Sequence, residues 1–404
     1  MKKLEKSVPV IRFKGFSEAW EQRELGELGE VTTGKAFSST SFDNQGEYLV
    51  ITNKNISDSS RSQNIITNRI SISDDEIIQR YRLDGENILV TMDGVNLGKT
   101  AMYSNANALL AQRVGRIKSN QLEFIYQITS SNTFLRTMQT LSVGNAIKHI
   151  SLKQISEYSS LGPKDIIERK KIGSFFKKLD NTIALHQRKL DALKLMKKGF
   201  LQQMFPKRGE NIPKIRLDDF DDIWEERILG EFLKESKIKG SNGSLAKKLT
   251  VKLWRKGVVP KEEIYTGSSA TQYYIRKTGQ FIYGKLDFLN QAFGIIPLEL
   301  DGYESTLDSP AFDIEESINE TFLLEYVSLV RFYKYQGNIA NGSRRAKRIH
   351  TDTFFEMPIP LPNSNEQQKI GTFSQQIDDL IALQQNKLEK ISSLKRFYLK
   401  NMFI

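Results

Sequence analysis

A glycine-rich segment followed by a lysine is the first stretch of this 404-residue chain that could bind a phosphate group. Gly94-Val-Asn-Leu-Gly98-Lys99-Thr100 has three residues between its glycines, whereas a nucleotide-binding P-loop has four and leads into a helix. The missing residue matters because a P-loop wraps consecutive backbone N–H groups around the phosphates. We therefore expect a turn within a β-rich domain, with Lys99 available to a phosphate, in preference to a nucleotide site.

The residues that catalysis or metal binding would need do not occur in recognisable patterns. Asp308-Ser-Pro-Ala-Phe312 lacks the second proline of the Asn/Asp/Ser-Pro-Pro-aromatic tetrapeptide of amino-methyltransferases, and no glycine-rich cofactor loop accompanies it. The histidines, His149, His186 and His350, form no ligand-spaced cluster, and the chain has no cysteine. We expect no catalytic residue, no metal and no cofactor on this chain.

Basic residues in loops give a stronger signal. Residues 142–150 and 341–349 run in parallel, because each has a small-residue turn, then cations, then an isoleucine. Glycine lets the backbone approach a phosphate, Lys and Arg supply charge, and Arg and Asn can pair with base edges. A solvated hairpin is the alternative for the first loop. The candidate DNA-binding residues are Asn53, Lys54, Asn55, Lys99, Arg113, Arg116, Lys148, Lys252, Arg255, Lys256, Lys285, Arg344, Arg345, Lys347 and Arg348.

The overall charge favours the same partner. The formal net charge is +11 and the pI is about 9.4. Basic proteins gain affinity for phosphate backbones by releasing condensed counterions. Charge alone also describes a solubilising surface, since it bears on association and not on fold. Nucleic acid is therefore the leading partner that composition predicts.

The elements that must position these residues are written twice in the chain. Pro9–Glu27 returns as Pro213–Glu231, identical at ten of nineteen positions. Glu168–Phe205 returns as Glu366–Phe403, identical at sixteen of thirty-eight positions without a gap. Between these blocks the two halves differ almost completely. The duplication predicts two tandem halves, each ending in the same helix, and one scaffold that presents two different surfaces.

The second repeated block has the heptad spacing of a packed helix. Each helix of roughly 38 residues would be about 55 Å long. Because a whole globular half separates them, we expect an antiparallel pair with pseudo-twofold symmetry, and His186 beside Gln384 as a polar layer. The residues expected to pack between the helices are Ile172, Phe176, Leu179, Ile183, His186, Leu190, Leu193, Ile370, Ile377, Ile381, Gln384, Leu388 and Ile391.

Length and repeats together set the expected division of the chain. We predict an α+β protein in which two tandem α/β domains are separated by two long helices packed as an antiparallel coiled coil. Residues 1–164 form the N-terminal segment and first domain, and residues 165–205 the central helix. Residues 206–365 form the linker and second domain, and residues 366–404 the C-terminal helix.

Composition also bears on location. No apolar run reaches the roughly 18 to 20 residues that a membrane span needs. The N-terminal residues carry positive charge but no following apolar core, so a secretory signal is not expected. We expect a cytoplasmic protein without a membrane partner.

The order and duplication of these motifs resemble the specificity subunit of type I restriction-modification systems. The resemblance covers essentially the whole chain. The motifs that carry it are Trp20–Glu27 and Trp224–Glu231, the segments Gly85–Thr91 and Ala292–Leu300, and the Glu-x-x-Lys-Ile-Gly-x-Phe helix starts at Glu168 and Glu366.

The resemblance implies that each half is a target-recognition domain for one part of a split DNA site. The long helices would be spacers and docking surfaces for two modification subunits, and restriction subunits with translocase and nuclease activity would join the assembly. S-adenosylmethionine, ATP and Mg²⁺ would bind to those partners, and this chain would not itself be an enzyme. Because the cores differ, double-stranded DNA would be read as an asymmetric bipartite sequence.

Two other classes of function remain open at this point. A stand-alone DNA-modifying enzyme is disfavoured by the missing cofactor loop. A basic coiled-coil scaffold is disfavoured by two large, divergent cores, which a simple rod does not require. The sequence leaves open the bases recognised, the gap between half-sites, which basic residues touch bases, the affinity without partners and the host organism.

Overall fold

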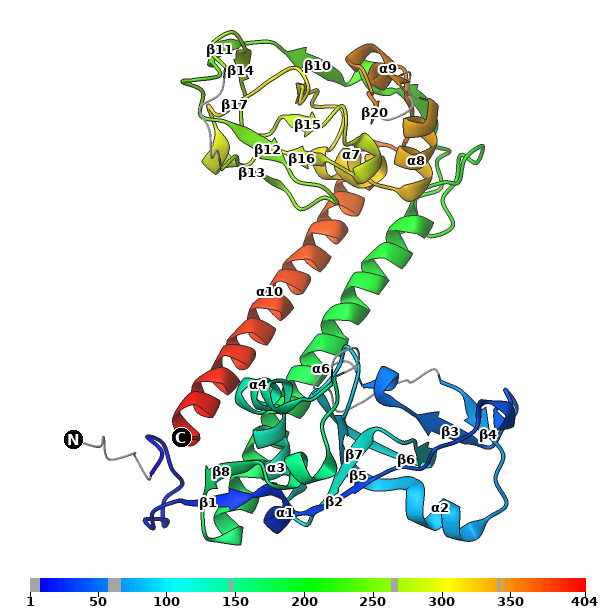
Figure 1. Ribbon diagram of the computed structural model, residues 1–404. Coiled ribbons are helices and arrows are strands. Elements are labelled where there is room, and N and C mark those ends of the chain that lie inside the picture. The colour runs from blue at the N-terminus through cyan, green and yellow to red at the C-terminus, as the bar shows by residue number, and fades with distance from the viewer. Residues whose placement is uncertain (1–7, 57–66, 145–147, 263–267, 340–341, 344–345) are drawn as a thin grey trace, which may run out of the picture. The chain divides into compact units, whose positions relative to one another are not determined.

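The computed structural model describes residues 8–56, 67–144, 148–262, 268–339, 342–343 and 346–404 (Figure 1). The chain forms two compact units. One contains the chain up to His186 together with Lys387–Ile404, and the other contains Gln187–Asn386. The two long helices, α6 (Ile166–Met204) and α10 (Ser364–Met402), each contribute residues to both units. Each compact unit thus includes parts of both helices, whereas the division predicted from the sequence treats each long helix as a segment of its own.

A six-stranded sheet forms the centre of the first unit (Figure 1). Its strand order is β2-β7-β5-β6-β3-β4, with a parallel pairing between β3 and β6 and antiparallel pairings elsewhere. A short pair, β1 with β8, lies outside this sheet. The strands are β1 (Glu21–Glu24), β2 (Glu30–Thr33), β3 (Tyr48–Ile51), β4 (Arg69–Ile70), β5 (Arg82–Thr91), β6 (Thr100–Leu110), β7 (Val114–Lys118) and β8 (Ser159–Gly162).

Both faces of β5 are buried, because successive side chains point to opposite faces of a strand. Ile88 and Val90 pack in a cluster with Phe124 of α3, whereas Leu89 packs in a second cluster with Ile51 of β3. Helix α4 begins at a polar cap, because the Ser131 hydroxyl accepts a hydrogen bond from the Phe134 N–H. The short helices are α1 (Leu25–Leu28), α2 (Asp75–Tyr81), α3 (Leu122–Thr129), α4 (Asn132–Leu141) and α5 (Leu152–Ser156).

The second unit contains a four-stranded sheet in the order β10-β18-β15-β16. Beside it are the three-stranded sheet β11-β14-β17 and the pairs β12-β13, β19-β20 and β21-β9. Its helices are α7 (Glu320–Val327), α8 (Val330–Ile339) and α9 (Thr351–Phe355). The strands are β9 (Glu225–Ile228), β10 (Leu233–Ser236), β11 (Lys239–Asn242), β12 (Leu249–Val251), β13 (Val258–Pro260), β14 (Gln272–Ile275), β15 (Phe281–Tyr283), β16 (Phe293–Ile295), β17 (Glu304–Ser305), β18 (Ala311–Ile314), β19 (Gly342–Ser343), β20 (Ala346–Lys347) and β21 (Pro358–Leu361).

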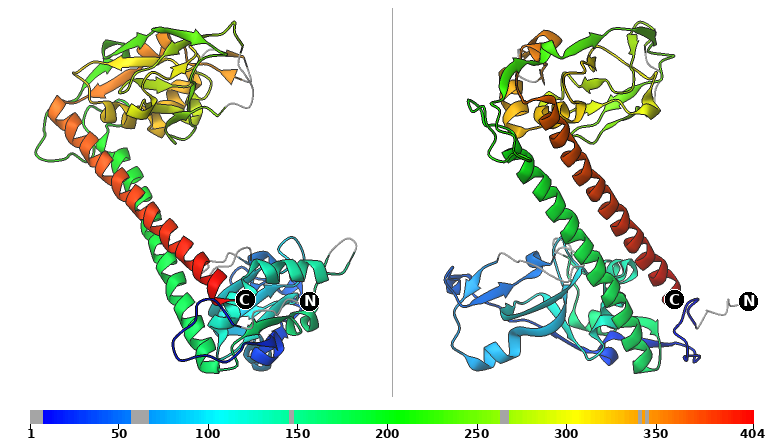
Figure 2. Two further views of the ribbon diagram at one scale, coloured as in Figure 1. Left: turned by 90° about the vertical axis from the view of Figure 1, so that its left-hand side faces the viewer. Right: turned by 180° about the vertical axis from the view of Figure 1, so that it is seen from behind.

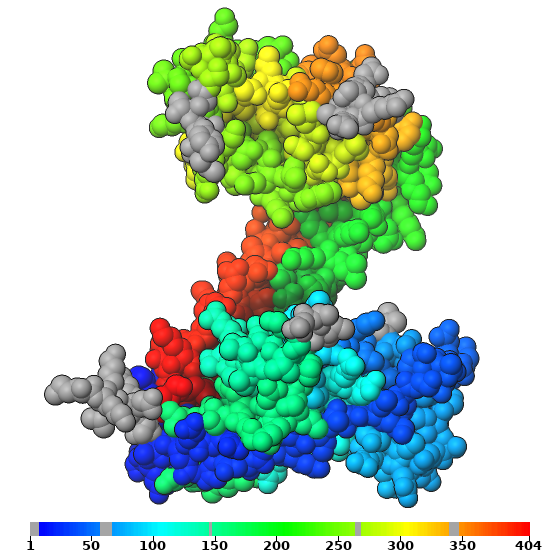
Figure 3. Space-filling view, viewed as in Figure 1, coloured from blue at the N-terminus to red at the C-terminus, as the bar shows by residue number. Residues whose placement is uncertain are grey.

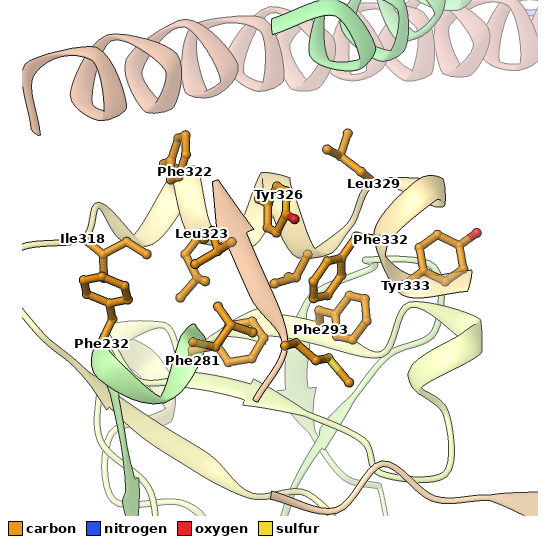
Figure 4. Close-up of a cluster of buried hydrophobic side chains, with 14 of the residues drawn as sticks. Phe232, Phe281, Phe293, Ile318, Phe322, Leu323, Tyr326, Leu329, Phe332 and Tyr333 are labelled. Carbon is orange, nitrogen blue, oxygen red and sulfur yellow. The ribbon is translucent and has the colours of Figure 1, made fainter. Parts of the chain in front are cut away.

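Aromatic side chains fill the core of the second unit. Phe281 and Phe293 of the sheet lie in one cluster with Phe322 of α7 and Phe332 of α8 (Figure 4). Aromatic rings bury large areas and pack edge to face or offset, which gives such a core a defined geometry. The sheet and the α7–α8 pair are thereby fixed to each other.

The central sheets of the two units share one topology although their sequences differ. The order β2-β7-β5-β6 in the first unit corresponds to β10-β18-β15-β16 in the second, and every pairing within the two sets is antiparallel. The repeated frame therefore extends into the segments that show almost no sequence repeat.

A buried Arg–Glu ion pair joins each repeated lead-in segment to the start of a long helix. Arg12 donates to both carboxylate oxygens of Glu168 at 2.7 and 2.8 Å, and Glu168 is 1% exposed. Arg216 likewise donates to both oxygens of Glu366, with 2.8 Å between Arg216 Nε and Oε1, and Glu366 is also 1% exposed. In the second unit the Trp224 indole N–H donates to the same carboxylate at 3.1 Å.

Within each unit the two long helices run antiparallel and side by side (Figures 1 and 2). In the first unit, Asp180 of α6 pairs with Lys395 of α10 at 2.5 Å. The ring of Phe175 on α6 packs edge to face against the ring of Tyr398 on α10.

In the second unit, Lys197 of α6 pairs with Asp378 of α10 at 2.6 Å, and Phe200 meets Phe373. These contacts join residues at matching positions of the repeat with the two helices exchanged. The predicted antiparallel packing is therefore present in each unit.

Every predicted helix-packing residue is buried or half-buried. His186 belongs to the first unit and Gln384 to the second, so their predicted proximity stays a prediction. Within the described ranges, no helix is both long and apolar enough to cross a bilayer.

Candidate nucleic-acid interface

In the first unit, a buried carboxylate organises the polar side chains at the end of β5. Asp93 is 4% exposed. Its carboxylate accepts a hydrogen bond from the side-chain amide of Asn53 and pairs with the Arg113 guanidinium at 2.7 Å. The Arg113 side chain remains 62% exposed. Asp93 thus fixes the position of an arginine and an asparagine that stay accessible to a ligand.

The predicted basic loop lies beside these residues. His149 forms a β-bridge with Asp93, and the Ile150 N–H donates to the Met92 carbonyl at 2.8 Å. Lys148 is exposed and directly precedes this contact. We call the residues at this end of the sheet the first polar surface: Asn53, Lys54, Asp93, Arg113 and Lys148.

The glycine-rich segment joins two strands, as predicted, and does not lead into a helix. Gly94 and Gly98 have φ angles of +74° and +81°, which glycine adopts readily. Between them, Val95 is fully exposed. Gly98 backs onto α4, whose outer face lies at the surface of the first unit (Figure 3). Lys99 directly follows this turn and is half-buried.

Two of the predicted residues have structural roles. The Asn55 side chain accepts hydrogen bonds from the backbone N–H and the hydroxyl of Thr52, at 2.9 Å each. Arg116 is 7% exposed and donates to the Thr32 hydroxyl at 3.1 Å, and burial lowers its pKa. Because Arg116 is buried and bonded to the neighbouring strand, it is not one of the exposed cations.

A second polar surface lies at the end of β15 in the second unit. The Lys285 N–H donates to the Asp308 carbonyl at 2.8 Å, and the Lys285 carbonyl accepts from the Ile349 N–H at 3.1 Å. Arg348 is exposed and pairs with the Asp308 carboxylate at 3.2 Å. Burial lowers the pKa of the Lys285 ammonium. We call Lys285, Asp308, Lys347 and Arg348 the second polar surface.

The two polar surfaces occupy equivalent places in the frame. The Met92 N–H donates to the Arg113 carbonyl at 3.0 Å, as Lys285 does to Asp308. Met92 and Lys285 therefore match, and so do Arg113 and Asp308. The charges differ at each matched position. Apolar Met92 corresponds to the cation Lys285, and the cation Arg113 corresponds to the acid Asp308.

The remaining predicted residues of the second basic loop are only partly described. Lys347 is exposed and donates to the Asn338 carbonyl at 2.8 Å. Arg344 and Arg345 lie outside the described residues, so their placement stays a prediction.

The last three predicted cations lie on the β12–β13 hairpin of the second unit. Lys252 and Lys256 are exposed. Arg255 forms a bidentate ion pair with Glu325 of α7, with 3.0 Å between Arg255 Nη2 and Oε1. A guanidinium held in this way is an anchor for the hairpin, so the predicted contact of Arg255 with DNA does not fit its position.

Glu325 joins this hairpin to both long helices. Its buried carboxylate also accepts from Lys197 of α6 at 2.9 Å and from the Ser374 hydroxyl of α10 at 2.6 Å. Burial by itself would raise the pKa of Glu325, but Arg255 and Lys197 outweigh it and lower the pKa to about 2. The ionised carboxylate is therefore part of the folded structure at neutral pH.

The structure offers cations and amides that are held in position at the ends of strands. Within the part of the chain that the structure describes, no group of three or more His, Asp or Glu side chains could hold a metal ion. Arginine and asparagine held by a buried carboxylate are suited to hydrogen bonding with base edges, and exposed lysines are suited to phosphates.

Comparison with known proteins agrees with the tandem organisation. The family model for the type I restriction modification DNA specificity domain matches residues 17–195 and again residues 222–393. The chain belongs to this family. Each match begins at one repeated lead-in segment and extends into one long helix, so the duplication corresponds to two specificity domains.

Two relatives align with this chain along most of their own length. The type I restriction enzyme MjaVIII specificity subunit of Methanocaldococcus jannaschii is 24% identical, and the alignment covers 94% of this chain and 91% of that protein. The putative type I restriction enzyme MjaX specificity subunit of the same organism is 23% identical over the same shares. Whole-length similarity places this chain among type I specificity subunits.

Solved structures share the fold. The S subunit of a type I restriction-modification system from M. genitalium has a TM-score of 0.64 at 12% identity, over 98% of this chain and 99% of its own. A chain from a study of complex assembly and conformational transition of the type I R-M system has a TM-score of 0.50 at 15% identity, over 95% and 97%. The fold of the specificity family therefore extends along nearly the entire chain.

Sequence reasoning missed three features of this specificity subunit. Asp93 gave no signal, because its partners lie 40 and 20 residues away in the chain. Trp254 is 54% exposed on the β12–β13 hairpin and stands next to predicted cations, which was an available signal. Leu185 and Leu383 are 59% and 51% exposed at matching positions of the helix repeat, so comparison of the repeats could have found them.

We predict that Glu325→Gln destabilises the second unit by about 3 kcal/mol at neutral pH. The folded pKa of about 2 lies below the ordinary 4.5, so the stabilisation is present above pH 4.5 and is lost as the pH falls towards 2. Hydrogen exchange measured by mass spectrometry should show faster opening of α7 in the variant at pH 7, and a smaller difference near pH 3.

Glu320→Gln, on the exposed first turn of the same helix, is the matched control. Peptides from the first unit serve as an internal reference. A difference between wild type and Glu325→Gln that is the same at both pH values would contradict the assignment.

Proposed function

We propose that the two polar surfaces each contact one part of an asymmetric bipartite DNA site. The observation that carries the proposal is that one four-stranded frame presents different charges at equivalent strand ends in the two units. Because the contact groups differ, the bases that they select should differ as well. Family membership supplies the role of DNA specificity, and the surfaces supply candidate contacts for it.

The chemistry of the surfaces suits a duplex. In the first unit, Arg113 and Asn53 can form bidentate bonds with guanine and adenine edges, and Asp93 holds both in place. In the second unit, Arg348 and Lys347 supply exposed cations beside Lys285. A net charge of +11 favours association with phosphates over the whole surface.

The long helices are proposed to set the gap between the half-sites. Both helices supply residues to both units, and each has 39 residues. A regular helix has a fixed rise per residue, which makes it suited to defining a length of unread DNA. Helices of fixed length should give a constant number of unread base pairs between the two half-sites.

The helices also present apolar side chains at repeat-matched positions. Leu185 and Leu394 are exposed in the first unit, and Leu383 and Met196 occupy the matching positions in the second. Exposed apolar groups on a helix favour a protein partner. We propose that these two places dock two modification subunits, one on each unit.

The complete assembly is proposed to divide chemistry from recognition. Modification subunits would carry S-adenosylmethionine, and restriction subunits would carry ATP and Mg²⁺, while this chain supplies the DNA contacts and is not catalytic. Methyl transfer to DNA by the purified chain alone would contradict this division.

Arg113→Ala is expected to weaken specific DNA binding about tenfold or more, because it removes one positioned cation from the first polar surface. Fluorescence anisotropy with the chain and its modification subunits at several salt concentrations is the measurement. A phosphate contact would lower the salt slope by about one, whereas a base contact would relax specificity at one position.

The matched control is Arg80→Ala, an exposed arginine on α2 of the same unit. It should bind DNA as the wild type does. If Arg113→Ala binds with unchanged affinity, slope and specificity, the first polar surface is not the contact surface.

Leu383→Asp is expected to remove one of the two modification subunits, because it places a charge in one docking surface. Native mass spectrometry of the reconstituted complex should then show one modification subunit per chain instead of two. Leu298→Asp, 75% exposed elsewhere in the second unit, should leave both in place. Two bound subunits in Leu383→Asp would refute docking at this position.

A further inference from the structure

The tip of the β12–β13 hairpin, residues 252–257, displays an exposed tryptophan. Trp254 is 54% exposed and its neighbour Leu253 is 38% exposed. The other two tryptophans of the chain, Trp20 and Trp224, are 4% and 1% exposed. The structure therefore leaves one tryptophan accessible and places it at the end of a hairpin.

The backbone of the hairpin tip is held in an unfavourable conformation. Trp254 and Arg255 have φ angles of +60° and +54°, a region that side chains with a Cβ rarely adopt. The Trp254 N–H donates to the Asn290 carbonyl at 2.7 Å, and the Arg255 N–H donates to the Gln291 carbonyl at 3.0 Å. Consecutive strained residues persist where surrounding contacts determine them, and such residues cluster at functional sites.

The anchor of the tip is independent of its exposed face. Arg255 is bound by the buried carboxylate of Glu325, which is itself held by Lys197 and Ser374. Trp254 is thus presented by a rigid support whose side-chain interactions are already satisfied. A rigid aromatic side chain loses little conformational entropy when it binds.

The hairpin tip is bonded to the connection between β15 and β16, at the same end of the sheet as Lys285 of the second polar surface. Asn290 and Gln291 belong to the connection between β15 and β16, which matches the connection between β5 and β6 in the first unit. In the first unit Asn53 contacts that connection through Asp93. The hairpin tip therefore lies beside the connection that contains Lys285 of the second polar surface.

We propose that Trp254 is an aromatic DNA contact of the second unit, stacking against a base within its half-site. This inference rests on the proposed function. Aromatic rings flanked by cations are a common means of binding nucleic-acid bases, and Lys252 and Lys256 flank Trp254 and are exposed. Apolar side chains that enter the base stack also bend DNA, which adds selectivity for deformable steps.

The test uses the accessibility of Trp254 in the complex. 5-Hydroxytryptophan is incorporated into this chain alone, so that partner tryptophans do not contribute to the fluorescence. Acrylamide quenching is measured for the chain with its modification subunits, before and after addition of duplex DNA carrying its site. We expect DNA to abolish most of the acrylamide quenching. The Trp254→Phe variant should not show this DNA-dependent change, because the other two tryptophans are buried.

Binding measurements with variants complete the test. Trp254→Ala should weaken specific binding about tenfold, whereas Trp254→Phe should stay within about threefold, because a phenyl ring can still stack. Leu298→Ala is the control for loss of an exposed apolar side chain in the same unit. Unchanged thermal unfolding of Trp254→Ala shows that the hairpin is intact.

The outcomes separate the inference from the proposed function. If the complex binds DNA specifically and acrylamide quenches Trp254 as strongly as it does without DNA, the inference is overturned and the proposed function still stands. Protection by modification subunits without DNA would also overturn it, because it would assign Trp254 to a protein contact. Absence of any specific DNA binding by the complex would instead refute the proposed function.

Discussion

The interaction on which both units depend is a buried arginine–carboxylate pair at the start of each long helix. Glu168 and Glu366 are almost inaccessible to water, and each is held by two bonds from one arginine. Removing one partner from such a pair costs about 3–5 kcal/mol, since a buried charge is left unpaired. The pair fixes the lead-in segment to the helix, and the helix in turn supports the sheet.

Around this fixed point the structure separates what repeats from what varies. The lead-in segments, the long helices and the order of four central strands are common to both units. The side chains at the ends of those strands are not. A common frame allows the contact groups to change without a change of fold, because loops at strand ends carry little of the core.

The repeated elements were predictable from the sequence and the recognition surfaces were only partly so. The long helices begin and end within a few residues of the repeated blocks, because heptad spacing is a local signal. The burial of Arg116 depends on pairing between β2 and β7, and the capture of Arg255 depends on Glu325, 70 residues away. Residue type alone cannot distinguish a paired cation from a free one. The shared strand order escaped detection because strands require a pattern of apolar residues and not their identities.

We propose that two different surfaces on one frame recognise two different half-sites at a fixed separation. Sequencing the methylome of a host that carries this gene and its modification partner tests this claim most directly. We expect methylation within a bipartite sequence whose two halves differ and whose gap has one length. A continuous site, two identical half-sites, or a methylation pattern that does not depend on this chain would contradict it.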